Sequence, residues 1–109
     1  MQKRGSGAAG RELDGLVELF RLLSDKTRLN ILLLLASGER NVTSLCEELA
    51  LPQPTVSHHL GLLRMRNLIN NRRNGKQVFY GLNGHVVPDG GHGLQIGTQS
   101  FNVMIAERD

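Results

Sequence analysis

The sequence predicts a small α+β domain that is mainly helical and carries one β-hairpin. Apolar residues recur at helical spacing through residues 11–36, and two prolines separate two short helical segments further along the chain. An Asn-Gly pair then lies between two partly alternating runs, and such a pair is the strongest short signal for a hairpin. Together these observations predict four helices followed by a two-stranded ribbon.

The length and composition indicate one domain with a small core. The chain has 109 residues, one cysteine and a formal net charge of +3. Residues 1–10, rich in glycine and alanine, are expected to form a flexible lead-in, and residues 11–83 the folded domain. Residues 84–109 form a Gly-rich segment that is a candidate contact for a second copy or a partner. No apolar run is long enough for a signal peptide or a membrane span, so we expect a cytoplasmic protein with no membrane partner.

Three helices are predicted before the prolines. The first covers residues 11–23, where a wide apolar stripe needs more than one neighbour. The second follows Ser24, its predicted cap, and ends at Gly38. Because the second helix is apolar nearly all round, we expect it at the centre of the core. The third is short and covers residues 43–50, with Thr43 as its predicted cap.

The fourth helix completes a helix-turn-helix. Pro52 ends the third helix, because proline lacks the amide hydrogen that a helix interior needs. Pro54 suits the first turn of the fourth helix, which is predicted to continue to about Met65. Two short helices separated by so tight a break are typical of a helix-turn-helix. Three residues of the fourth helix are predicted to face the core: Val56, Leu60 and Leu63.

A hairpin is predicted directly after the fourth helix. Residues 68–73 and 76–82 both alternate in part, and the second run contains consecutive β-branched and aromatic residues. Asn74 and Gly75 accept positive φ, so we expect them to form the two-residue turn.

The C-terminal segment is harder to assign. Its many glycines argue against a long helix. Residues 94–98 and 101–105 alternate apolar and polar, which predicts one or two short strands. The alternative for the second run is a short helix capped by Ser100.

Positive charge is concentrated in the second half of this pattern. Residues 51–88 contain five Lys or Arg residues and no Asp or Glu, whereas residues 11–50 contain five basic and seven acidic residues. A basic segment joined to a slightly acidic one indicates an oriented contact with a polyanion, although a solvated face is the commoner meaning of a charge run. A helix that fits a groove beside a cationic ribbon is what a reader of duplex DNA needs.

Several motifs resemble the ArsR/SmtB family of bacterial repressors. Residues 19–32 are similar to the opening of that family, residues 53–60 to its second helix-turn-helix element, and residues 72–80 to its wing. The resemblance covers roughly residues 11–83. It implies a winged helix-turn-helix homodimer that binds operator DNA and releases it when an effector binds.

The residues expected to contact DNA come from the fourth helix and the hairpin. The helix offers donors and acceptors for base edges and phosphates, and the hairpin tip offers cations for the backbone. Helix geometry turns His59 partly toward the core, so packing inside the domain is the alternative for that residue. The complete set is Gln53, Thr55, Ser57, His58, His59, Arg64, Arg72, Arg73 and Lys76.

The usual metal sites of the family are expected to be missing, and we expect no cofactor. Many members carry two cysteines on the third helix, where this chain has Asn41 and Thr43, which lack the thiolate that soft metals prefer. The second family site uses Asp and His on a C-terminal helix. The matching positions here hold no ligand: Gly84, Val86, Gly97 and Ser100.

Two weaker candidates come from the residues themselves. Cys46 is a candidate redox residue, but a lone helical cysteine beside leucines is more often a small buried hydrophobe. His85, Asp89 and His92 lie within eight positions and are a candidate metal site, although ordinary loop polarity is the better interpretation.

No group of residues indicates catalysis, because the chain has neither a nucleophile elbow nor usefully spaced carboxylates. The sequence therefore predicts a non-enzymatic DNA-binding regulator, a homodimeric repressor of a pseudo-palindromic operator with an effector that it does not identify. The alternative is a winged-helix interaction module that docks a partner through the C-terminal segment.

Overall fold

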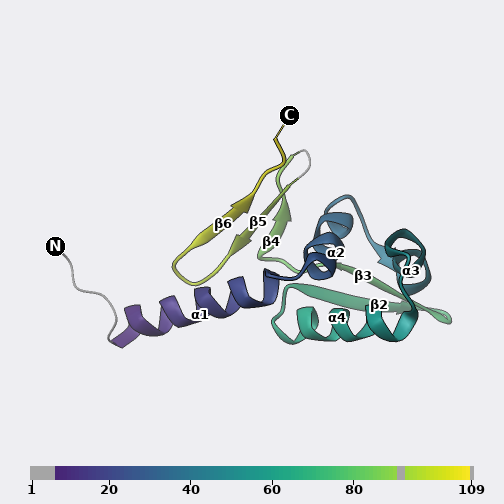
Figure 1. Ribbon diagram of the computed structural model, residues 1–109, viewed down its shortest axis with the longest axis horizontal. Coiled ribbons are helices and arrows are strands. Elements are labelled where there is room, and N and C mark those ends of the chain that lie inside the picture. Colours follow the sequence, from purple (N-terminus) through teal and green to yellow (C-terminus); the bar gives the residue numbers. More distant parts are fainter. Residues whose placement is uncertain (1–6, 91–92, 109) are drawn as a thin grey trace.

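The computed structural model describes residues 7–90 and 93–108 and has the predicted α+β architecture (Figure 1). None of its described helices is long and apolar enough to cross a bilayer. In chain order, the elements are α1 (Gly7–Leu23), α2 (Lys26–Ala36), β1 (Arg40–Asn41), α3 (Val42–Leu49), α4 (Gln53–Met65), β2 (Ile69–Asn74), β3 (Gln77–Leu82), β4 (Val86–Pro88), β5 (Leu94–Gly97) and β6 (Asn102–Ile105).

The apolar faces of the helices meet in one buried cluster. Helix α2 supplies three residues that are at most 3% exposed, so its predicted place at the centre of the core is confirmed: Ile31, Leu32 and Leu35. The predicted inward residues of α4 are also buried: Val56, Leu60 and Leu63. Each such side chain stabilises the fold by roughly 1.5–3 kcal/mol relative to exposure. The cluster continues into the C-terminal strands through Val86, Leu94 and Ile96.

The first two helices differ from expectation at their starts. Helix α1 begins at Gly7, so the lead-in expected over residues 1–10 is too long by four residues; residues 1–6 lie outside the described part. Asp25, rather than Ser24, caps α2, because its Oδ1 accepts the N–H of Arg28 at 3.0 Å. That hydrogen bond lowers the pKa of the Asp25 carboxyl. Ser24 instead donates to the carbonyl of Arg21.

The start of α3 is built differently from the prediction. Its cap is Asn41, whose Oδ1 accepts the N–H of Ser44 at 2.7 Å, whereas Thr43 is exposed on the first turn. Asn41 also belongs to β1, a two-residue strand that the sequence did not indicate. Strand β1 pairs with the middle of β3, with Asn41 opposite Phe79.

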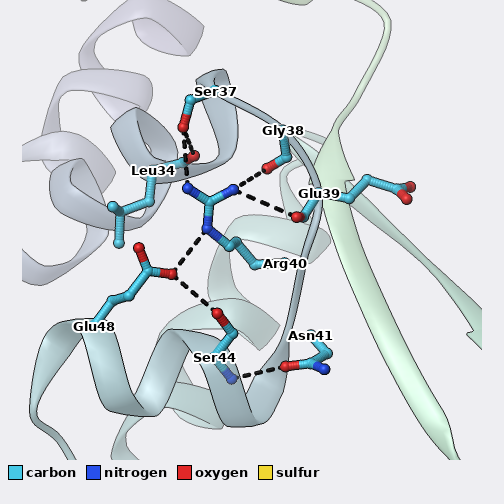
Figure 2. A network of polar contacts seen from close by, with 8 residues as sticks. All are labelled: Leu34, Ser37, Gly38, Glu39, Arg40, Asn41, Ser44 and Glu48. Carbon is cyan, nitrogen blue, oxygen red and sulfur yellow. Dashed lines mark hydrogen bonds and ion pairs between the residues drawn. The ribbon is translucent and has the colours of Figure 1, made fainter.

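Arg40 ties the end of α2 to α3. Figure 2 shows its guanidinium between the two helices, with Nε 2.8 Å from Glu48 Oε2 and Nη2 3.1 Å from Ser37 Oγ. Nη1 donates to the carbonyl of Gly38 at 3.0 Å. These contacts hold α3, the first helix of the helix-turn-helix, against the end of α2.

The predicted hairpin is confirmed, but its turn is displaced by one residue. Asn74 pairs with Gln77, so Gly75 and Lys76 form the two-residue loop. Only Gly75 has a positive φ, at 65°, which is the first-position glycine typical of a type II′ turn. The expected Asn74-Gly75 turn is therefore wrong. A loop with glycine at its first position, here Gly75, has a twist that matches the twist of the two strands.

The C-terminal segment forms a separate antiparallel sheet in the order β4-β5-β6, which stands over α1 in Figure 1. The two predicted strands are confirmed as β5 and β6, and a helix capped by Ser100 is wrong. Strand β4 was not predicted. At Gly93 a Cβ would lie 2.1 Å from the carbonyl oxygen of Ile105, so only glycine fits where the chain enters β5.

Removing the Asn41 cap should destabilise the domain. Asn41→Ala leaves the N–H of Ser44 without its acceptor, so we expect the free energy of unfolding to fall by about 1 kcal/mol. The matched control is Thr43→Ala in the same turn, which should change it by less than about 0.5 kcal/mol. Urea unfolding followed by circular dichroism measures both variants, and equal losses would contradict the assignment of the cap.

Candidate nucleic-acid interface

The backbone makes the turn of the helix-turn-helix. Ala50 ends α3 in the left-handed region with φ 55°, and its N–H donates to the carbonyl of Glu47. The N–H of Leu51 reaches back to the carbonyl of Cys46 at 3.1 Å, completing a Schellman motif. Pro52 then precedes α4 and offers no side-chain cap, so the positive end of the α4 dipole is left open.

The face of α4 opposite the core is exposed and polar. Its inward residues leave Gln53, Ser57 and His58 exposed, while Thr55 is half-buried. Arg64 extends this face toward the end of the helix and is exposed. Gly61 lies one turn beyond Ser57, and no heavy atom lies within 4 Å of the position its Cβ would take. The face can therefore approach another surface closely at its middle.

His59 does not belong to this exposed face. The ring is half-buried, and its Nδ1 lies 3.1 Å from Arg28 Nη1 and 4.0 Å from Asp25 Oδ1. Because an arginine only donates, Nδ1 accepts that hydrogen bond and the ring proton is assigned to Nε2. Arg28 also donates through Nε to the carbonyl of Leu22 at 2.6 Å. The structure thus places His59 against the junction of α1 and α2. This is the alternative stated for His59 from the sequence, packing inside the domain.

The wing lies beside α4 and presents its turn to solvent. Strands β2 and β3 form the antiparallel ribbon, and the side chains of Arg73 and Lys76 are exposed at its tip. Neither cation takes part in an ion pair within residues 7–90 and 93–108. Both are therefore free to meet an anion.

Arg72 is placed differently from the other cations of the wing. Its Nη2 lies 2.8 Å from Glu39 Oε1, its Nε lies 3.2 Å from both carboxylate oxygens, and its guanidinium lies 4.9 Å from the ring centroid of Phe79. The hydrogen bonds from Arg72 lower the pKa of the Glu39 carboxyl, and the same contacts raise the pKa of Arg72. The pair compensates the charge of Arg72, which leaves Arg64, Arg73 and Lys76 as the exposed cations of this surface.

The remaining candidates are not assembled into a site. Cys46 is half-buried and packs against the core. His85 is exposed, Asp89 is half-buried, and His92 lies outside the described residues. Within the described residues there is no cluster of three metal-ligating side chains.

Sequence reasoning missed Glu39 and Gly61. Glu39 lies 33 positions from Arg72, and the two-residue strand that brings it near has no periodicity to detect. Gly61 had a usable signal, because it is four residues after Ser57 and therefore on the same helical face.

The profile described as bacterial regulatory protein, arsR family, matches residues 25–71. The transcriptional regulator KmtR of Mycobacterium tuberculosis is 48% identical over 71 residues, which cover 64% of this chain and 55% of KmtR. The transcriptional repressor SdpR of Bacillus subtilis is 35% identical over 71 residues, which cover 65% of this chain and 79% of SdpR.

A solved structure of similar fold is the homodimeric winged helix-turn-helix DNA-binding domain of "a possible ArsR-family transcriptional regulator" from Mycobacterium bovis. It superposes with a TM-score of 0.65 at 31% identity, over 77% of each chain. The present chain thus matches most of SdpR and of this domain, but only about half the length of KmtR. The relatives are regulators rather than enzymes, and the chain belongs to the arsR family of bacterial regulatory proteins.

Proposed function

We propose that this protein is a transcriptional repressor that binds duplex DNA as a homodimer in the cytoplasm. One observation carries the proposal: the exposed polar face of α4 lies next to a wing whose tip presents Arg73 and Lys76. A helix face and a cationic ribbon side by side match a major groove and the adjoining sugar–phosphate backbone.

Helix α4 is the reading element in this proposal. Gln53, Ser57 and His58 supply donors and acceptors for base edges, and Gly61 lets the helix backbone come close to the groove. Thr55 and Arg64, at the two ends of the face, suit contacts to phosphates. His59 supports α4 from behind through Arg28 and does not read bases.

The wing supplies affinity that does not depend on sequence. Arg73 and Lys76 are placed to neutralise phosphates or to enter the minor groove. Arg72 has a different role, because its Nε and Nη2 groups already donate hydrogen bonds to Glu39. We assign it to holding the wing at a constant angle to β1 and α3.

Helix α1 is the proposed dimer contact. Val17 and Phe20, one turn apart on its outer side, are 47% and 51% exposed. Burying such large apolar side chains against a second copy is favourable, and the related domain from M. bovis is homodimeric. A twofold axis then predicts a pseudo-palindromic operator with half-sites about one helical turn apart or a multiple of it.

Release from DNA requires an effector that binds the DNA-incompetent dimer better than the competent one. We propose that it is not a soft metal held by a thiolate pair on α3. The two positions hold Asn41, which caps the helix, and Thr43.

Recovering the genomic fragments that the purified protein binds tests the function. We expect enrichment of one or a few promoter fragments that share an inverted repeat. Binding to promoter and random fragments alike, or to neither at low ionic strength, would contradict the proposal. The second result would favour a protein-interaction module.

The wing cations should set the salt dependence. Replacing both, Arg73→Ala with Lys76→Ala, should weaken binding to all duplexes and reduce the slope of log K against log salt by about two units per subunit, which is about four units for the dimer. The matched control is Glu39→Ala with Arg72→Ala, which removes a compensated pair and should leave the slope unchanged. Fluorescence anisotropy at several salt concentrations gives the slopes. A slope that falls only in the control would reverse the roles assigned to these arginines.

The outer side of α1 should govern assembly. Val17→Glu with Phe20→Glu should give a monomer in analytical ultracentrifugation and weaken operator binding by about a hundredfold, because the second half-site contact is lost. Leu33→Glu, an exposed apolar position of α2, is the control and should remain dimeric. A dimeric double variant would place the interface elsewhere.

A further inference from the structure

A hollow of about 250 Å³ lies between α1, the segment that joins α4 to β2, and the C-terminal sheet. Its apolar wall consists of Leu19, Leu68 and Ile96, each at most 5% exposed. The volume lies just below the ~300–1,000 Å³ range of pockets for drug-sized ligands, so it suits a small molecule. In Figure 1 this is the region where the β4-β5-β6 sheet stands over α1.

The polar rim of the hollow favours an anion. Arg11 and Arg66 both line it, together with the carboxylate of Glu12. Arg66 is paired with Glu18, whereas Arg11 takes part in no ion pair within the described residues. Glu12 accepts a hydrogen bond from Ser100, which engages part of its acceptor capacity. Arg66 donates through Nη1 to Glu18 at 2.8 Å and has further N–H groups for a second acceptor.

We propose that this hollow binds a small amphipathic monocarboxylate. The carboxylate would lie between Arg11 and Arg66, and the apolar body would cover the wall of buried aliphatic side chains. Carboxylates pair well with the planar donor fork of arginine, and an apolar pocket with few polar groups is the usual construction of a small-molecule site.

The position of the hollow couples it to both proposed DNA-contacting elements, α4 and the wing, an argument that rests on the function proposed above. Arg66 is the C-terminal cap of α4. Leu68 directly precedes the wing, and its N–H donates to the carbonyl of Leu63 while its own carbonyl accepts the N–H of Asn83. The opposite wall is α1, the proposed dimer helix. A ligand here would therefore contact the end of α4, the start of the wing and α1. The relative placement of these three elements decides whether a dimer fits two half-sites, so the geometry assigns the ligand the role of effector.

Gly15 allows the site to be closed without disturbing the fold. It lines the hollow on α1, and nothing lies within 4 Å of where its Cβ would be. Gly15→Phe should therefore fill the hollow, while Gly15→Ala keeps it open; both should strengthen the helix relative to glycine. The comparison separates blocking the site from any effect on α1.

The experiment titrates octanoate into the full chain by isothermal calorimetry, with 1-octanol as the uncharged probe. Wild type and Gly15→Ala should bind octanoate, and 1-octanol should bind at least tenfold more weakly. Gly15→Phe should not bind, and Arg66→Gln should lose at least tenfold in affinity. No binding of octanoate, equal binding of 1-octanol, or undiminished binding by Gly15→Phe would overturn the site.

Operator binding is measured separately, with and without octanoate. Octanoate should weaken operator binding in wild type and Gly15→Ala but not in Gly15→Phe. Calorimetric binding with unchanged operator affinity would overturn the role as effector. Failure to bind DNA without octanoate would count against the proposed function alone, because the calorimetry does not depend on DNA.

Discussion

The pairing of β1 with β3 is the constraint on which the geometry of the surface depends. Only Arg40 and Asn41 take part, yet Asn41 also caps α3, so a single residue connects the helix-turn-helix to the wing. The register of this pair places Glu39 over the ribbon, where it meets Arg72 and passes above Gly81 at close range. A shift of one residue would turn these side chains to the other face.

Ion pairs separate the cations of residues 51–88 into two groups. The segment without acidic residues contains only basic charges, between Arg64 and Lys76, but the fold brings two carboxylates to it from elsewhere. Glu39 engages Arg72 and Glu18 engages Arg66. Both pairs are exposed and contribute little to stability, so their consequence is the position of charge. The exposed cations that remain are those near the open side of α4 and at the tip of the wing.

The C-terminal sheet makes this chain differ from what its resemblance implied. The resemblance implied a C-terminal helix that carries the family's second metal site, whereas here the C-terminal sheet packs on the same core through Val86 of β4 and through Leu94 and Ile96 of β5. The sheet forms one wall of the hollow and α1 forms another. The apolar side chains Val17 and Phe20 of α1 stay exposed in the same fold.

The sequence by itself determined the helices, the hairpin and the inward residues of α4, because these follow from local periodicity and from proline and glycine chemistry. It also indicated the family, through motifs that are contiguous along the chain. Tertiary structure alone decided that His59 faces Arg28, that Arg72 is held by Glu39, and that β1 exists. Each of these depends on residues more than 30 positions apart, or on a strand of two residues, and local patterns contain no information about such contacts.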